Sequence, residues 1–120
     1  MTDSFDALPW HDAELLEISV DRRHAGERDE VRLRIAWPQG EEATLLFRGC
    51  YSMNAAMNFG VIATEQILAA RIVEQDPGLI ALRKQWAPLG LSLQKLRCFQ
   101  IETNSTASVI RIYAQEFEIG

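Results

Sequence analysis

The sequence predicts an α+β domain in which one antiparallel sheet of about five strands carries one or two helices on one face. Three observations lead to this fold class. Alternating apolar residues occur in the first half of the chain, apolar residues at helical spacing follow, and alternation returns at the end. Strands grouped at both ends of a chain around a helical middle are typical of an antiparallel sheet with helices on one face. The 120 residues fit a single domain spanning 1–120.

The first half of the chain predicts three strands, at 13–21, 31–37 and 43–47. In the first of them, Leu16, Ile18 and Val20 alternate with polar residues, which is the pattern of a half-buried strand. Proline and glycine within 38–40 predict a tight turn before the third strand. The short connections between these strands indicate an antiparallel meander.

The spacing of apolar residues becomes helical in the middle of the chain. A stripe that includes Leu68 and Ile72 predicts a helix from residue 58 or 60 to about residue 75. Asp76 and Pro77 then begin a second helical segment, because aspartate is a good N-cap and proline is tolerated at the first helical position. The proline and glycine before residue 91 end this segment.

Two further strands are predicted at 91–103 and 107–119, which completes the order β-β-β-α-α-β-β. In the last strand, Ile110 and Ile112 are in phase, whereas Phe117 and Ile119 are out of phase with them. A slip of one residue is typical of a β-bulge, which we place near 114–116.

The charge of the chain limits its partners. The formal net charge is −5 and the isoelectric point is about 5.0. A protein that binds the nucleic-acid backbone needs a basic face, so we expect no nucleic-acid partner. No run approaches the roughly 18 apolar residues of a membrane-spanning helix, so we expect no membrane partner.

The cysteines and the N-terminus predict a cytoplasmic protein. Cys50 and Cys98 lie in or at the end of apolar runs, where a cysteine is more often a small buried apolar residue than half of a disulfide. The N-terminus is acidic and lacks the apolar core of a secretion signal. Two separated cysteines without a signal peptide indicate a reducing compartment.

Trp10, His11, Asp12 and Glu14 form the densest chemical grouping of the sequence, directly before the first predicted strand. An imidazole beside carboxylates could serve as an acid–base pair or contribute to a metal site. Neighbouring residues of a strand point to opposite faces, however, and the only other histidine, His24, lies in a charged loop. We therefore expect no metal and no cofactor. The favoured role is structural: Trp10 packs on the core, and His11 or Asp12 hydrogen-bonds the start of the sheet.

Cys50 and Tyr51 follow the third predicted strand and complete the candidate functional cluster. A cysteine near a helix N-terminus can have a stabilised thiolate, as a Cys–His nucleophile with His11 would require. The apolar density around Cys50 favours burial instead. The sequence contains no glycine-rich phosphate loop, no Gly-x-Ser-x-Gly elbow, no His-Glu-x-x-His and no Cys-x-x-Cys, and we assign no catalytic residue.

Uncharged polar residues gather at Asn54, Asn58 and 103–106. They could line the mouth of a ligand site through side-chain hydrogen bonds. The favoured interpretation is a turn whose side chains bond to nearby backbone.

The segment Leu8-Pro9-Trp10-His11-Asp12 before an alternating strand, in an acidic, strand-rich chain of this size, resembles small uncharacterised bacterial α+β domains. Some of these are immunity proteins of polymorphic toxin systems. The resemblance covers the whole chain at the level of architecture, and its motif spans five residues. It implies binding to a toxin domain without turnover, and it carries over no site residues.

We therefore expect a non-enzymatic cytoplasmic binding module that acts through a protein partner. The acidic balance predicts a basic partner whose complex weakens with salt. The alternative is a small-ligand binder or an enzyme with a site around His11, Asp12, Cys50 and Tyr51. The helices and the last strand also leave a homodimer open.

Overall fold

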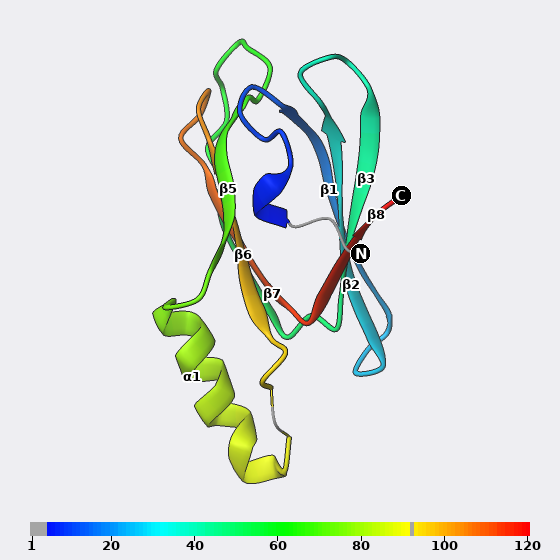
Figure 1. The fold of residues 1–120 in the computed structure, drawn as a ribbon, viewed down its shortest axis with the longest axis vertical. Coiled ribbons are helices and arrows are strands. Elements are labelled where there is room, and N and C mark those ends of the chain that lie inside the picture. The colour runs from blue at the N-terminus through cyan, green and yellow to red at the C-terminus, as the bar shows by residue number, and fades with distance from the viewer. Residues whose placement is uncertain (1–4, 92) are drawn as a thin grey trace.

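A computed structural model describes residues 5–91 and 93–120, and strands are the main secondary structure of this chain (Figure 1). Every pair of neighbouring strands is antiparallel, as the sequence predicted. The elements in chain order are η1 (Phe5–Ala7), β1 (Glu14–His24), β2 (Arg28–Ala36), β3 (Glu42–Arg48), β4 (Ser52–Ala56), β5 (Ile67–Val73), α1 (Pro77–Trp86), η2 (Ala87–Leu89), β6 (Arg97–Thr103), β7 (Val109–Ala114) and β8 (Glu116–Ile119), where η denotes a short 3₁₀ helix.

The expected single sheet of about five strands is wrong, because the strands form two four-stranded sheets. Their orders are β1-β2-β3-β8 and β4-β7-β6-β5, and the sheets lie on either side of η1 (Figure 1). The chain crosses between the sheets twice, at 49–51 and at Gln115. The slip in the phase of the apolar residues predicted a β-bulge near 114–116. It arises instead at the second crossing, where the chain passes from β7 to β8 of the other sheet.

The predicted helix from residue 58 or 60 to about 75 is also wrong. This stretch contains a loop and then β5, whose register shifts between Ile67 and Ala69. The shift makes Leu68 a bulged residue and leaves Ile67, Ala70 and Ile72 opposite inward-facing residues of β6. The bulge thus separates inward residues by three positions, which imitates helical spacing. The short strand β4 was not predicted.

The helix α1 begins where the sequence placed it. The Asp76 side chain accepts a hydrogen bond from the Leu79 N–H at 3.0 Å, and Pro77 occupies the first turn. The helix packs at one end of the second sheet (Figure 1), through an apolar cluster that includes Leu79, Cys98 and Tyr113. No helix in the described part of the chain is long and apolar enough to cross a membrane.

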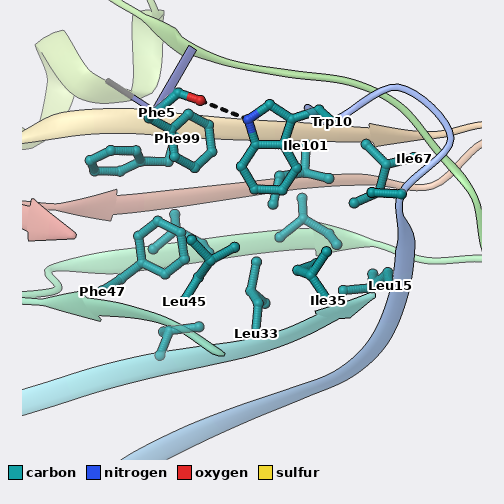
Figure 2. Packing of buried hydrophobic residues seen from close by; sticks show 14 of the residues in the cluster. Phe5, Trp10, Leu15, Leu33, Ile35, Leu45, Phe47, Ile67, Phe99 and Ile101 are labelled. Carbon is teal, nitrogen blue, oxygen red and sulfur yellow. Dashed lines mark hydrogen bonds between the residues drawn. The ribbon is translucent and has the colours of Figure 1, made fainter. Parts of the chain in front are cut away.

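The main core fills the space between the two sheets (Figure 2). Phe5 of η1 is fully buried there, with its ring centroid 5.1 Å from that of Phe99 on β6 and 6.1 Å from that of Phe47 on β3. The rings of Phe47 and Phe99 lie 5.1 Å apart across the sandwich. Aromatic packing therefore joins the sheets directly and through the N-terminal segment.

A second bulge, in β1, changes which side chains of the first predicted strand face the core. The register of β1 against β2 shifts between Leu15 and Glu17, so Leu15 joins the core and Leu16 does not. Leu15 is 9% exposed and Leu16 is 42% exposed. The expectation that Leu16 shares the core face with Ile18 and Val20 is wrong, because the bulge adds one residue to the alternation.

This orientation predicts a contrast between adjacent leucines. Leu15→Ala should lower the free energy of unfolding by about 2–4 kcal/mol, because it leaves a cavity in the core. Leu16→Ala should change it by less than about 1 kcal/mol. Urea denaturation of both variants measures the difference, and equal losses would contradict the bulge.

Candidate functional site

Trp10 has the structural role that the sequence favoured. Its side chain is buried in the main core, and its Nε1–H donates a 2.7 Å hydrogen bond to the Phe5 carbonyl oxygen (Figure 2). Its ring lies edge-on to that of Trp37, with centroids 5.3 Å apart. Trp10 thus fixes the path of the N-terminal segment between the sheets.

His11 and Asp12 lie on the surface beside the start of β5. The His11 Nδ1 is 3.3 Å from the Leu68 carbonyl oxygen, and its Nε2 is 3.7 Å from the Asp12 carboxylate. The Asp12 N–H donates to the Ile67 carbonyl oxygen at 3.1 Å, and the backbone of Asp12 takes a positive φ of 69°. Both side chains are exposed, and they form no enclosed acid–base site.

The N-terminal segment covers the outer edge of β5. Besides the contacts of His11 and Asp12, the Asp6 carboxylate accepts a 2.8 Å hydrogen bond from the Ile72 N–H. The Ile67 N–H donates to the Ala13 carbonyl oxygen at 2.7 Å, and Glu14 forms an isolated bridge with Gln66. These bonds occupy backbone groups that an edge strand would otherwise leave free.

Cys50 and Tyr51 lie at the opposite end of the sandwich from His11. The Tyr51 N–H donates to the Tyr113 carbonyl oxygen, and Tyr113 pairs with Cys98 at the start of β6. His11 lies beside the start of β5, whose first residue pairs with Thr103 at the end of β6. From Cys98 to Thr103 a strand spans about 17 Å. The structure therefore does not bring His11 to Cys50.

The environment of Cys50 disfavours a thiolate. The side chain is half-buried, and its Sγ–H donates to the Phe47 carbonyl oxygen at 3.3 Å. Burial raises the pKa of the Cys50 thiol to about 11, and the nearby carboxylates Asp29 and Glu30 act in the same direction. The adjacent Tyr51 packs edge-on against Trp86, with ring centroids 5.3 Å apart.

Metal binding finds no support in the geometry. Among residues 5–91 and 93–120, no group of three or more His, Cys, Asp and Glu side chains is placed to hold an ion. Cys50 and Cys98 are free thiols.

A polar network joins the loop 57–66 to the hairpin between β6 and β7. Thr106 donates through its N–H and its hydroxyl to the Glu65 carboxylate. The Asn58 side chain donates to the Thr106 carbonyl oxygen at 2.9 Å, and the Asn58 N–H donates to the Ser108 hydroxyl at 2.9 Å. The Ser105 hydroxyl accepts from the Gln66 N–H at 3.2 Å. Residues 104–106 lie in the connection from β6 to β7, as the favoured turn required, but the Asn58 and Ser105 side chains bond a distant segment instead of their own backbone. Asn54 lies outside this turn, in β4.

This anchored loop exposes large apolar side chains. Phe59 is 82% exposed and Ile62 is fully exposed, although backbone groups on both sides are hydrogen-bonded. Between the loop and β1 lies a groove of about 400 Å³, which we call the apolar groove. Its apolar lining comprises Leu15, Leu16, Ile18, Met57, Phe59, Val61 and Ala63. Apolar residues held in solvent by a fixed backbone are characteristic of interaction sites.

Carboxylates border the apolar groove. Glu17 and Glu65 both line it, and no arginine or lysine does. Glu17 lies 4.0 Å from Arg34, whereas Glu65 has no cationic partner in the described ranges. The groove therefore combines an apolar lining with a negative border.

A second polar cluster anchors α1 to its sheet. The buried Asp76 carboxylate accepts the Tyr113 hydroxyl at 2.7 Å and the Leu79 N–H at 3.0 Å, with Arg111 Nε at 3.7 Å. Burial and this bond to Asp76 raise the pKa of Tyr113. A Cβ at Gly78 would lie 2.5 Å from the Tyr113 hydroxyl, so the close approach needs glycine. With these partners, Asp76 serves as a helix cap.

Sequence reasoning missed the apolar groove because the helix predicted from residue 58 or 60 includes Val61 and Ile62. The available signal was local: Asn58 and Gly60 flank Phe59, and such residues favour turns over helices. Comparison of the sequence with protein-family models and with curated proteins gives no match.

The structural role of the Trp10-His11 pair is testable. Trp10→Ala should lower the free energy of unfolding by about 3–5 kcal/mol, because it removes a buried ring and a buried hydrogen bond. His11→Ala should cost less than about 1 kcal/mol, because the ring is exposed. Denaturation curves of the two variants measure the change in the free energy of unfolding. A larger loss of this free energy for His11→Ala than for Trp10→Ala would refute the structural role of Trp10.

The raised pKa of Cys50 predicts slow alkylation. Near neutral pH its thiolate fraction should be about a hundredth of that of an ordinary cysteine. Mass spectrometry of peptides after iodoacetamide treatment should give a rate at Cys50 that increases up to about pH 11. A Cys50→Ser variant supplies the blank, and rapid modification at neutral pH would contradict the burial argument.

Proposed function

We propose that this chain is a non-enzymatic binding module and that the loop 57–66 and the apolar groove contact a protein partner. The observation that carries the proposal is the exposure of Phe59 and Ile62 on a loop whose backbone is held by hydrogen bonds. Aromatic and aliphatic side chains presented by an ordered backbone bind at low entropic cost.

The charges around the groove favour a basic partner. The chain has a net charge of −5, and Glu17 and Glu65 border the apolar lining. Complementary charge increases the rate of encounter and excludes acidic competitors. An acidic border also opposes insertion of the loop into an anionic membrane.

The outer face of the first sheet is a weaker candidate for the contact surface, because its charges pair with one another. Arg34 bonds Glu42, Arg48 lies 2.7 Å from Glu118, and Arg32 lies 3.8 Å from Asp21. A hydrogen bond from Arg23 holds the pKa of Asp21 well below its usual range. A partner would have to break these exposed pairs to use the arginines.

The nucleophile version of the enzyme alternative has no support, since His11 and Cys50 lie apart and burial raises the pKa of the Cys50 thiol to about 11. An immunity-like role fits the same binding surface and would make the partner a basic toxin domain. Cytoplasmic location belongs to the proposal as well, supported by the two free cysteines.

The proposal predicts that one substitution abolishes the complex without unfolding the protein. Tagged wild-type chain, Phe59→Asp and Leu89→Asp are used to capture proteins from an extract of the source cells, followed by native mass spectrometry. Leu89 is a matched control, because it is an exposed apolar residue on η2, beyond α1. A stoichiometric partner should bind wild type and Leu89→Asp and be lost with Phe59→Asp, while both variants keep their stability within about 1 kcal/mol.

Capture that is insensitive to Phe59→Asp, or capture of the bare chain alone, would overturn the assignment of this surface. For a captured partner, the association rate should fall between about 0.05 and 0.5 M salt. A salt-independent rate would remove the electrostatic part of the proposal.

A further inference from the structure

The two edges of the sandwich differ in how the strands there are covered. At one edge, β5 and β8 lie on either side of η1, where Phe5 packs 5.3 Å from Phe117 and Asp6 bonds the backbone of β5 (Figure 1). At the other edge, cavities lie between β1 and the segment that forms β4 and its flanks. We call this second edge the open seam, defined by residues 15–22 and 50–57.

Two cavities lie along the open seam. The apolar groove, of about 400 Å³, lies between the first half of β1 and residues that follow β4. A second cavity of about 270 Å³ lies between the second half of β1 and the start of β4, and it is lined by Val20, Arg22, Asp29, Glu30, Val31, Cys50, Tyr51, Ser52 and Met53. Both strands are outermost in their sheets.

The core-facing side of β1 is uncovered at Val20, within this seam. Val20 pairs with Val31 of β2, so both side chains point to the same side of the sheet. Val31 is 2% exposed, whereas Val20 is 56% exposed. The opposite sheet therefore covers β2 and leaves the same face of β1 open at Val20.

The backbone of β1 is also unpaired along this edge. Leu15 donates its N–H to the Glu65 carbonyl oxygen, and this is the last backbone bond on that side. In the described chain, residues 16–20 make backbone hydrogen bonds only to β2. An unpaired strand edge beside apolar cavities can accept a further strand from another chain.

We propose that the open seam binds an extended segment of the protein partner, which adds to β1 as a fifth strand of its sheet. Alternate side chains of the segment would enter the two cavities, because successive residues of a strand point to opposite faces. This inference rests on the proposed function and specifies how the partner binds.

Glu65 lines the apolar groove without an arginine or lysine partner among the described residues, and it favours a basic residue in the bound segment. Four carboxylates line the two cavities of the open seam, and three of them have an arginine partner: Asp29 lies 2.7 Å from Arg22, Glu30 lies 3.4 Å from Arg32, and Glu17 lies 4.0 Å from Arg34. Lysine or arginine between the apolar residues of the segment would face Glu65, in a chain whose net charge is −5. The expected sequence pattern is therefore an alternation of apolar and basic residues.

A second copy of this chain fits the edge poorly. Pairing β1 with itself over its full length centres on Ser19 and places Glu17 of each copy opposite Asp21 of the other. Like charges that are directly opposite destabilise a strand pair. This register therefore disfavours a second copy as the occupant.

The test uses random displayed peptides of about 12 residues, which are long enough to span β1. Selection on the immobilised chain should enrich alternating apolar and basic residues. Methylation of alternate backbone nitrogens in a selected peptide should abolish binding, because strand addition uses those N–H groups. Hydrogen exchange should slow in residues 16–20 when the peptide binds.

Adjacent substitutions on β1 supply matched variants. Val20→Lys places a charge at the open seam and should weaken peptide binding by about tenfold or more, whereas Ser19→Lys on the opposite face should change it by less than about threefold. Both positions are exposed, and denaturation confirms that both variants fold.

Several outcomes would overturn strand addition. Peptides with helical spacing, tolerance of backbone methylation or unchanged exchange in β1 would each refute it. If peptides that fail these tests bind the wild-type chain but not Phe59→Asp, the proposed function stands and only the proposed mode of binding is refuted. Selection of no peptide, or dimerisation of the chain through β1, would refute the inference as well.

Discussion

Four phenylalanine rings hold the two sheets against each other, and the rest of the structure depends on this contact. Phe47 and Phe117 come from one sheet, Phe99 from the other, and Phe5 from the N-terminal segment between them. Each of these rings lies within 6.3 Å of the other three, in tilted or edge-on arrangements that suit aromatic pairs. Removing Phe5 would leave both sheets with an unfilled space at the centre of the core.

This packing explains why the Trp10-His11-Asp12 motif stands where it does. Phe5 can fill the core only if the following residues leave the sandwich again and reach the start of β1. The bond from Trp10 to the Phe5 carbonyl oxygen and the bond from Asp12 to Ile67 guide that path. The motif thus covers the edge of the sandwich at β5, and its polar groups contact the backbone there.

Closure of one edge leaves the other as the natural place for interaction. The N-terminal segment occupies the backbone of β5, but no equivalent segment among the described residues reaches β1 beyond Leu15. Apolar cavities, a free strand edge and an anchored loop with exposed Phe59 and Ile62 meet on this side. The proposed function and the proposed mode of binding both follow from this asymmetry.

The local features of the chain could be predicted from patterns in the sequence. Alternation located β2 and β3 and the cores of β6 and β7, and the Asp76-Pro77 pair located the start of α1, because these patterns record contacts between near neighbours. The preference for a structural Trp10 likewise came from local reasoning about strands.

The distribution of the strands between two sheets depends on contacts in the folded molecule, which the sequence patterns do not record. Bulges at Leu16 and Leu68 alter the period, so alternation predicts the wrong face for Leu16 and helical spacing predicts a helix where β5 lies. The crossings at 49–51 and Gln115 divide the strands between two sheets, and alternation is the same whichever sheet a strand joins. The separation of His11 from Cys50 and the open edge of β1 depend on those crossings, and therefore on contacts between residues far apart in the sequence.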